Sequence, residues 1–347
     1  MTGKQRFLAA IRSDETDRHS VHPAIDLSYA AARYGFGVGE CFMNPSLHAK
    51  ALSFIFECHP DIDGLYVNLC LCPDACESLW EDGDSFYGAD FGGMTWAAPK
   101  NDIGSVKTRD IASLSDERLF TQNPLKEGIL ATYTQIPQNI RDEYMIVPGL
   151  TGPFSQIVFM LGLEETLIQM FDDTAGLERA LEARTLMALE WAEEYSRLGC
   201  ECVWIGEGAA SSSIISPAMY ERFVMPYAQQ VVKRLHQRGV RTIMHVCGDI
   251  NKSAAIIAQT GVDVMDIDYM VPLDHARAAT GGKICLKGNF NPMELLAKSA
   301  PEIESACAAL ISGAPRPFVL STGCLVARDT PPENVEAMVG ASKTALQ

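Results

Sequence analysis

The segment MHVCGD carries the residues best suited to chemistry, because it places His245 and Cys247 two positions apart. On an extended chain, side chains two residues apart point to the same face. An imidazole and a thiolate on one face make half of a zinc site, although a core histidine beside a packed cysteine would give the same pattern. Cys324, in the segment LSTGC near the end of the chain, offers a third soft ligand.

A set of one histidine and two cysteines favours zinc over hard cations, because imidazole and thiolate are soft ligands. Three protein ligands leave a fourth coordination position open for a substrate, which is typical of a catalytic zinc site. We therefore predict that His245, Cys247 and Cys324 bind a catalytic Zn²⁺ ion, provided that the fold brings the two segments together.

The elements that must position these residues alternate regularly in the second half of the chain. Helical periodicity predicts helices over residues 177–198, 216–238, 251–260, 273–280, 301–312 and 332–345. Short apolar runs between them predict strands at 200–205, 241–246, 262–267, 283–287 and 318–321. Such a series of βα units requires a parallel sheet, because each crossover returns the chain in the same direction.

The first half supplies three more candidate strands, at residues 21–27, 64–71 and 144–150. Eight parallel strands, each followed by a helix, make a closed (β/α)₈ barrel, with an open doubly wound sheet as the alternative. We predict an α/β fold of the TIM-barrel type, forming a single domain over residues 1–347. The Gly- and Asp-rich stretch 73–126 is predicted to be a lid-like insertion over the barrel mouth.

Catalytic groups of such barrels lie at the carboxyl ends of the strands, so the polar residues there are further candidates. Glu207, Asp266 and Asp268 are candidate catalytic acids or bases that we expect near the metal. Glu207 is equally well explained as a helix cap, and the two aspartates could instead support the metal ligands. Three other polar residues are candidates for substrate binding: Asp26, Asn68 and Asn289.

Composition narrows the class of protein. The chain has 28 Lys+Arg against 44 Asp+Glu, a net charge of −16, which disfavours nucleic acid and anionic membranes as partners. No apolar run reaches the roughly 18 residues of a membrane helix, and the N-terminus does not resemble a secretory signal. We therefore expect a cytoplasmic protein whose 11 cysteines are reduced. Cys70, Cys72 and Cys76 lie close together without a histidine, and most other cysteines are expected to be packing residues.

Three segments, MHVCGDI, KGNFNPMELL and STGCLVARDTPPENVEAMV, make the chain resemble the uroporphyrinogen decarboxylase superfamily. The resemblance is greater to its zinc-dependent branch, the methylcobamide:coenzyme M methyltransferases and the corrinoid-linked O-demethylases. It spans nearly the whole chain, from KQRFLAAIRSDETDRHSV through GLTGPF and ISPAMYERFVMPY to the C-terminus. The branch's metal ligands, a His-x-Cys pair and a late Cys, match His245, Cys247 and Cys324.

This resemblance implies a methyltransferase that works with a cobalt corrinoid. The sequence lacks the Asp-x-His-x-x-Gly pattern of a cobalamin-binding module, so the corrinoid (cobalamin) is expected on a partner protein. The decarboxylases of the superfamily use N-terminal arginines to bind a porphyrinogen, whereas the first predicted strand here has none before Arg33. Porphyrinogen decarboxylation is therefore disfavoured, because an octacarboxylate needs fixed cations.

The identity of the small molecule stays open between two main alternatives. Aromatic residues near the presumed strand ends of the first half favour a methoxylated aromatic donor, because such side chains can wall a flat apolar ligand. They are Tyr29, Tyr34, Phe36, Tyr66, Trp80, Phe86, Tyr87, Phe91 and Trp96. Aromatics at such positions are more often core or lid packing, and transfer from methylcobamide to a thiol is the alternative. Less favoured are a metal-free decarboxylase that uses Asp26 or Glu207 as acid, and a non-catalytic corrinoid or tetrapyrrole carrier.

Overall fold

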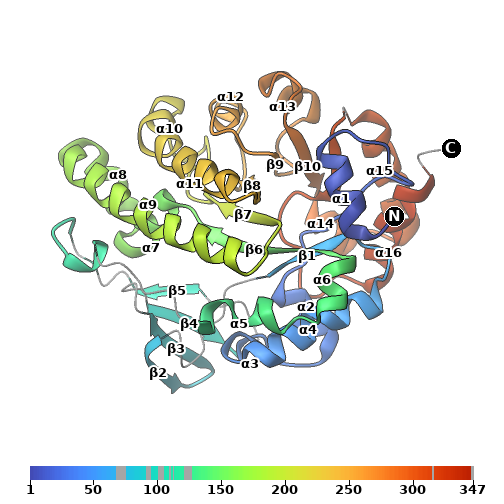
Figure 1. The fold of residues 1–347 in the computed structure, drawn as a ribbon, viewed down its shortest axis with the longest axis horizontal. Helices are drawn as coiled ribbons and strands as arrows, with labels where there is room; N and C mark the ends of the chain where they lie inside the picture. The colour runs from blue at the N-terminus through green and yellow to red at the C-terminus, as the bar shows by residue number, and fades with distance from the viewer. Residues whose placement is uncertain are drawn as a thin grey trace.

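The computed structural model describes residues 1–67, 76–90, 95–100, 105–108, 111, 113–120, 127–314 and 316–344. Its centre is a parallel sheet of seven strands in the order β1-β6-β7-β8-β9-β10-β11, with helices on the outside (Figure 1). The strands are β1 (Gly64–Val67), β6 (Met145–Thr151), β7 (Cys202–Gly206), β8 (Arg241–His245), β9 (Val264–Asp266), β10 (Cys285–Phe290) and β11 (Phe318–Thr322).

The segment 20–25 closes the gap between β11 and β1, the first and last strands of this sheet. Val21 forms an isolated parallel bridge with Leu320, and the His22 amide donates to the Leu320 carbonyl at 2.9 Å. On the other side, the Asp63 amide donates to the Val21 carbonyl at 2.8 Å. The predicted (β/α)₈ TIM-barrel fold is therefore confirmed, with the first wall position filled by a single bridge.

The predicted first strand at residues 21–27 is thus much shorter than expected, for two local reasons. Pro23 lacks an amide hydrogen and cannot continue a ladder. Asp26 then begins a helix, because its carboxylate accepts from the Ser28 amide at 2.9 Å as the N-cap of α2 (Leu27–Tyr34).

Helices follow the strands around the barrel. Those of the second half are α7 (Pro153–Leu161), α8 (Leu163–Asp172), α9 (Thr174–Arg197), α10 (Pro217–Phe223), α11 (Met225–Gln237), α12 (Ala254–Ala258), α13 (Leu273–Ala279), α14 (Pro292–Ala297), α15 (Ala300–Gly313) and α16 (Pro332–Thr344). The single helix predicted over residues 216–238 is two helices, because Pro226 starts a new helix after Val224. The short α14 was not predicted.

The first half contributes α1 (Gly3–Ile11), α3 (Val38–Met43), α4 (Pro45–Cys58), α5 (Glu127–Gln135) and α6 (Gln138–Glu143), besides α2. Helix α1 covers the amino-terminal end of the barrel, where Phe7 and Ile11 pack with inward-facing strand residues such as Met145 and Val319. A second and larger apolar cluster fills the layer between the strands and the outer helices. The interior of the barrel is therefore a packed apolar core near its base, and inward-facing polar residues of the strands, such as Asp266, lie above this layer.

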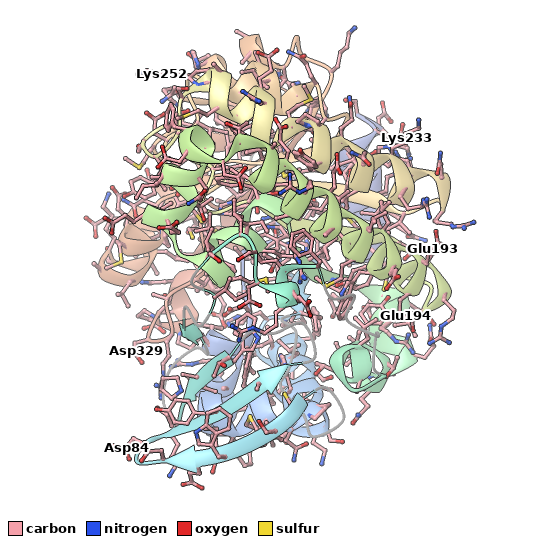
Figure 2. All side chains as sticks on the ribbon, turned by 90° about the vertical axis from the view of Figure 1, so that its left-hand side faces the viewer. Asp84, Glu193, Glu194, Lys233, Lys252 and Asp329 are labelled. Atoms are coloured by element: carbon pink, nitrogen blue, oxygen red, sulfur yellow. The ribbon has the colours of Figure 1, made fainter. Side chains whose placement is uncertain are left out.

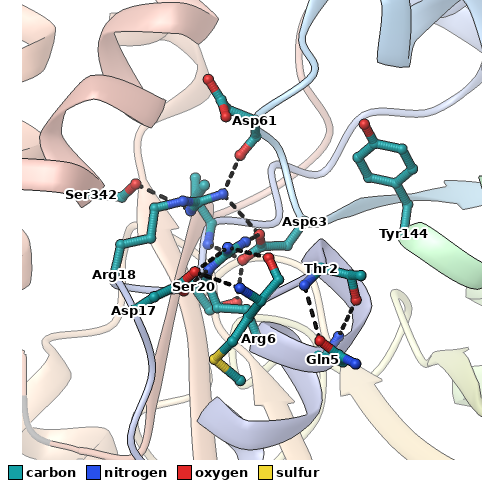
Figure 3. Close-up of polar contacts among 12 residues, drawn as sticks. Thr2, Gln5, Arg6, Asp17, Arg18, Ser20, Asp61, Asp63, Tyr144 and Ser342 are labelled. Carbon is teal, nitrogen blue, oxygen red and sulfur yellow. Dashed lines mark hydrogen bonds and ion pairs between the residues drawn. The ribbon is translucent and has the colours of Figure 1, made fainter.

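A cluster of buried charges secures this base (Figure 3). The Asp63 carboxylate, which is fully buried, accepts from Arg6 at 2.5 Å, Arg18 at 3.0 Å and the Ser20 hydroxyl at 2.7 Å. Arg6 also pairs with Asp17 at 2.6 Å. Because two guanidinium groups and one hydroxyl satisfy it, the buried carboxylate is tolerated at the junction of α1, the segment 20–25 and β1.

A four-stranded antiparallel sheet lies within the stretch predicted to be an insertion. It consists of β2 (Cys76–Asp82), β3 (Ser85–Asp90), β4 (Thr95–Pro99) and β5 (Ser105–Thr108). It lies at one end of the molecule, with Asp84 at the turn between β2 and β3 (Figure 2). The amide of Gly39 in α3 donates to the Lys100 carbonyl just after β4 at 3.3 Å, which joins the sheet to the barrel. Its role as a lid stays a prediction.

None of the described helices is both long enough and apolar enough to cross a membrane.

Candidate metal centre

Three soft side chains meet at the carboxyl ends of the barrel strands. The ligand atoms of His245, Cys247 and Cys324 all lie within 4.8 Å of one another. His245 ends β8, Cys247 follows in the next loop, and Cys324 lies two residues after β11. His245 is buried, Cys324 is half-buried and Cys247 is exposed, so the cluster opens to solvent on the Cys247 side.

Backbone features explain why the two loops approach so closely. A Cβ on Gly323 would lie 2.4 Å from the amide nitrogen of Tyr269, so only glycine allows the end of β11 to pass the end of β9. The Asp268 carboxylate accepts from the Gly248 amide at 2.7 Å and from the Tyr269 amide at 2.6 Å. Asp268, predicted as catalytic, therefore holds the loop that carries Cys247.

The hydrogen bonds of the cluster define its protonation. The Nδ1 of His245 lies 3.1 Å from the backbone carbonyl of Asp266, which can only accept, so Nδ1 carries the proton. The Nε2 is then the ring nitrogen that faces the sulfurs, and it lies 3.3 Å from the Cys247 sulfur. This is the orientation that a metal-binding histidine requires.

The thiols share charge unequally. The Cys247 thiol and the His245 imidazole lower the pKa of Cys324 to about 4. The hydrogen bond with Cys324, together with burial, raises the pKa of Cys247. Burial lowers the pKa of His245, but Cys324 and the Asp266 carboxylate outweigh it and leave that pKa above its usual value. One thiolate is thus formed at neutral pH before any cation binds.

These donors fit a zinc ion. They supply one imidazole nitrogen and two sulfurs, and the pKa of the Cys324 sulfur is already lowered. A borderline-soft cation prefers such a set. A divalent cation would also ionise the second thiol. With three protein donors and an open side, the arrangement suits a metal that binds a fourth ligand from solution.

Glu207 contacts a helix end instead of pointing freely into the mouth. Its carboxylate accepts from the amides of Phe154 at 3.3 Å and Ser155 at 2.9 Å, the first turn of α7. A Cβ on Gly152 would lie 2.2 Å from this carboxyl group, so the contact depends on glycine. Burial raises the pKa of Glu207 to about 7, although the two amides oppose this effect. The helix-cap explanation is supported, and a catalytic role stays a prediction.

Asp266 is buried in a polar cluster inside the barrel. Its carboxylate accepts from the Tyr66 hydroxyl at 2.7 Å and from the Lys287 ammonium at 3.1 Å. Lys287, which is fully buried, is not among the residues predicted from the sequence. The sequence does contain a sign of this position. In the strand CLKGN, Lys287 alternates with Cys285 and Asn289, so it faces the inside of the barrel as the predicted Asn289 does.

The predicted substrate-binding residues Asp26 and Asn289 both make structural hydrogen bonds, and their role in substrate binding stays a prediction. The Asn289 amide donates to the Val271 carbonyl at 2.7 Å, which ties β10 to the loop before α13. Asp26 is fully buried as the N-cap of α2. Asn68 lies outside the described residues, as do Cys70 and Cys72.

Among the described aromatic residues, Tyr66 lies inside the barrel, whereas Tyr29 bonds His59 at 3.0 Å and Trp80 stacks on Tyr87 in the antiparallel sheet. Phe91 is not described. The aromatic ring at the cluster is that of Trp204, which sequence analysis did not single out. It stacks on the His245 ring with centroids 5.7 Å apart.

Fold and site together define a barrel whose chemistry lies at the carboxyl ends of its strands. The family model described as uroporphyrinogen decarboxylase (URO-D) matches residues 89–345, and the chain belongs to this family. The predicted family resemblance is thereby confirmed.

The chain is similar to named methyltransferases of that family. It is 27% identical over 200 residues to a "Methylated-thiol--coenzyme M methyltransferase" of Methanosarcina mazei, covering 57% of this chain and 53% of that protein, so the match spans about half of the relative. It is 24% identical over 246 residues to the "Methylcobamide:CoM methyltransferase MtbA" of the same organism, covering 69% and 71%. These names agree with the resemblance to the corrinoid-linked branch.

A solved structure, a "methyltransferase from Methanosarcina mazei", superposes with a TM-score of 0.79 at 22% identity and covers 100% of both chains. A B12-independent methionine synthase from Shewanella sp. W3-18-1 superposes with a TM-score of 0.52 at 11% identity, covering 86% of this chain and 88% of that one. At such low sequence identities the likeness concerns the fold alone. Both solved structures share the barrel fold of this chain.

Proposed function

We propose that the protein is a zinc-dependent, corrinoid-linked methyltransferase. It transfers a methyl group between the cobalt of a separate corrinoid protein and a small molecule held at His245, Cys247 and Cys324. The observation that carries the proposal is the convergence of these three ligand atoms within 4.8 Å at the open end of the barrel. We place the enzyme in the cytoplasm, in keeping with its charge and reduced cysteines.

The residues of the chain prepare this site in three ways. The hydrogen bond from Nδ1 of His245 to the Asp266 carbonyl directs Nε2 toward the two sulfurs. Cys324 supplies a thiolate at neutral pH, because its pKa is lowered to about 4. Asp268 holds the loop that carries Cys247, because its carboxylate accepts a hydrogen bond from the Gly248 amide. A zinc ion bound there would act as a Lewis acid on the sulfur or oxygen atom that exchanges the methyl group.

A thiol is the first candidate for the small molecule. The relatives named above act on coenzyme M or methylated thiols by their printed names, and a thiolate suits a sulfur-rich zinc site. A methoxylated aromatic donor, favoured by the sequence, is the second candidate. The specific support for it is the Trp204 ring stacked on His245, which offers a flat apolar wall beside the cluster.

A porphyrinogen decarboxylase is not favoured, because the N-terminal arginines are engaged elsewhere. Arg6 and Arg18 pair with the buried Asp63, which directly precedes β1 and so lies at the amino-terminal end of the barrel, away from the carboxyl ends of the strands. Neither guanidinium is therefore placed to bind propionate groups at the strand ends.

The test combines metal analysis with a paired activity assay. Protein purified without chelator should contain about one zinc per chain. Cys324→Ala should lose both metal and activity while its circular dichroism stays native, whereas Cys307→Ala, a buried cysteine on α15, should keep both. Full activity of a metal-free Cys324→Ala protein would refute the proposal.

The paired assay separates the two substrates. With methylcobalamin and a thiol such as coenzyme M, a thiol methyltransferase should demethylate the cobalt, which changes the corrin absorption. With a reduced cobalt(I) corrinoid protein and methoxylated aromatics, an O-demethylase should form methylcobalt instead. No absorption change in either mixture would exclude corrinoid-linked transfer with these substrates.

A further inference from the structure

Lys287 is a fully buried lysine inside the barrel that the proposed reaction does not use. Its ammonium donates to the Asp266 carboxylate at 3.1 Å and to the Ser321 hydroxyl at 2.7 Å. It also lies 4.9 Å from the centre of the Tyr66 ring. A charged group buried this deeply is costly unless it is paired and hydrogen-bonded, so its position calls for a reason beyond packing.

The strand register links this lysine to the metal centre. His245 on β8 pairs in register with Asp266 on β9, and Asp266 pairs in register with Lys287 on β10. The three side chains therefore lie side by side on the inner wall of the barrel, with Asp266 between the other two. A substitution of Lys287 can therefore affect His245 through Asp266, which contacts both residues.

Asp266 contacts His245 in two competing ways. Its backbone carbonyl accepts from Nδ1 at 3.1 Å, whereas its carboxylate oxygen lies 3.8 Å from the same nitrogen. Lys287 holds one carboxylate oxygen and the Tyr66 hydroxyl holds the other at 2.7 Å. Both oxygens are thus occupied, and the carbonyl keeps the imidazole hydrogen bond.

We infer that Lys287 is a positioning residue for the metal centre, which acts by holding the Asp266 carboxylate away from His245. The inference rests on the proposed binding of zinc by His245, Cys247 and Cys324. Without the ammonium, the carboxylate loses one of its two anchors and can turn toward Nδ1 of His245, which already lies 3.8 Å from it. The ring then turns from the Asp266 carbonyl, and Nε2 moves away from the direction of the two sulfurs.

The expected effect is a loss of zinc affinity. Groups that orient a metal-binding histidine typically contribute about 10- to 100-fold in affinity. We expect Lys287→Met to weaken zinc binding by about that factor in a competition with a chromophoric chelator. The absorption spectrum of the Co²⁺-loaded protein should also change, because it reports the geometry around the metal.

A second variant separates positioning from general stability. Lys287→Met alone leaves a buried carboxylate without its cation, so it should also lower the melting temperature. The double variant Lys287→Met/Asp266→Asn removes both charges and should recover melting temperature, because neutral pairs are often tolerated in place of buried ion pairs. Zinc affinity should stay low in the double variant, because without Lys287 the side chain at position 266 is held by Tyr66 alone, and its amide oxygen can turn to accept from Nδ1 of His245 in place of the backbone carbonyl. If Lys287→Met does not fold, the double variant carries the test.

The charge cluster at the base of the barrel provides a matched control. Arg18 pairs with the buried Asp63 at 3.0 Å, at the other end of the strands from the metal. Arg18→Met should lower the melting temperature and leave zinc affinity and the Co²⁺ spectrum unchanged.

The possible outcomes distinguish the positioning role of Lys287 from the proposed metal site itself. Zinc affinity of Lys287→Met or the double variant equal to that of the unmodified protein would overturn the positioning role alone. Folded, unmodified protein that binds no zinc would overturn the proposed metal site, and the positioning role with it. Weak zinc binding in both variants, at a recovered melting temperature in the double one, supports the inference.

Discussion

The buried carboxyl group of Glu207 predicts a pH dependence of stability with a definite sign. Burial raises its pKa from an ordinary value of 4.5 to about 7. A raised pKa means that the folded protein holds the proton more tightly than the unfolded chain. The resulting stabilisation is complete below about pH 4.5 and is lost as the pH rises through about 7. The difference between the two pKa values corresponds to about 3 kcal/mol in the free energy of unfolding. About 2.5 kcal/mol of this stabilisation is lost between about pH 5 and pH 8.

The perturbation is Glu207→Gln, which keeps an oxygen acceptor for the amides of Phe154 and Ser155 but cannot ionise. The free energy of unfolding of both proteins is measured with urea across this pH range, after chelator treatment. The metal-free state matters because a bound cation would change the charge near Glu207. Subtracting one protein from the other cancels the titration of the cysteines and histidines.

We expect the stability of the unmodified protein to fall by about 2.5 kcal/mol relative to Glu207→Gln between about pH 5 and pH 8. A difference that stays constant over this range would show that Glu207 titrates normally in the folded state. A difference of opposite sign would show that the helix amides outweigh burial. Either result would refute the reasoning.

Three further predictions concern the site and the base of the barrel. Gly323→Ala should weaken zinc binding without unfolding the protein, as measured by chelator competition and circular dichroism, because its Cβ would lie 2.4 Å from the Tyr269 amide. Asp63→Asn should cost about 3–5 kcal/mol in urea unfolding, because it leaves two buried guanidinium groups without their carboxylate; a loss below about 1 kcal/mol would contradict this. A chelator should lower the melting temperature of the unmodified protein but not of Cys324→Ala, because a ligand stabilises only the chain that binds it.

Much of the barrel could be predicted because its signals are local. The strand from Arg241 to His245 is a short apolar run between a helix ending at Gly239 and a loop, and it forms as β8. The seam at Val21 could not be predicted in the same way. Its hydrogen bonds depend on a strand almost three hundred residues away, and Pro23 and Asp26 shorten it locally.

The residues of the candidate site also differ in whether local sequence signals could identify them. His245, Cys247 and Cys324 could be identified because side-chain type and strand-end position together restrict their chemistry, and the structure brings them together. The hydrogen-bond partners of Glu207 and Asp266 could not be identified from the sequence, because they come from other elements, α7 and β10. Strand periodicity shows which face a carboxylate occupies, but not which neighbouring strand supplies its cation or amide.

The hydrogen bonds that close the barrel have a consequence for folding order. Leu320 exchanges backbone hydrogen bonds with Ser20 and His22, so the wall joins an early and a late part of the chain. Such a contact has a very large sequence separation and delays the final folding step. During synthesis, the segment carrying Ser20 must wait with an unpaired edge until β11 leaves the ribosome. Cys324 follows two residues after β11, so the third of the proposed ligands is synthesised with the closing strand, and the full set of three can assemble only after β11 has emerged.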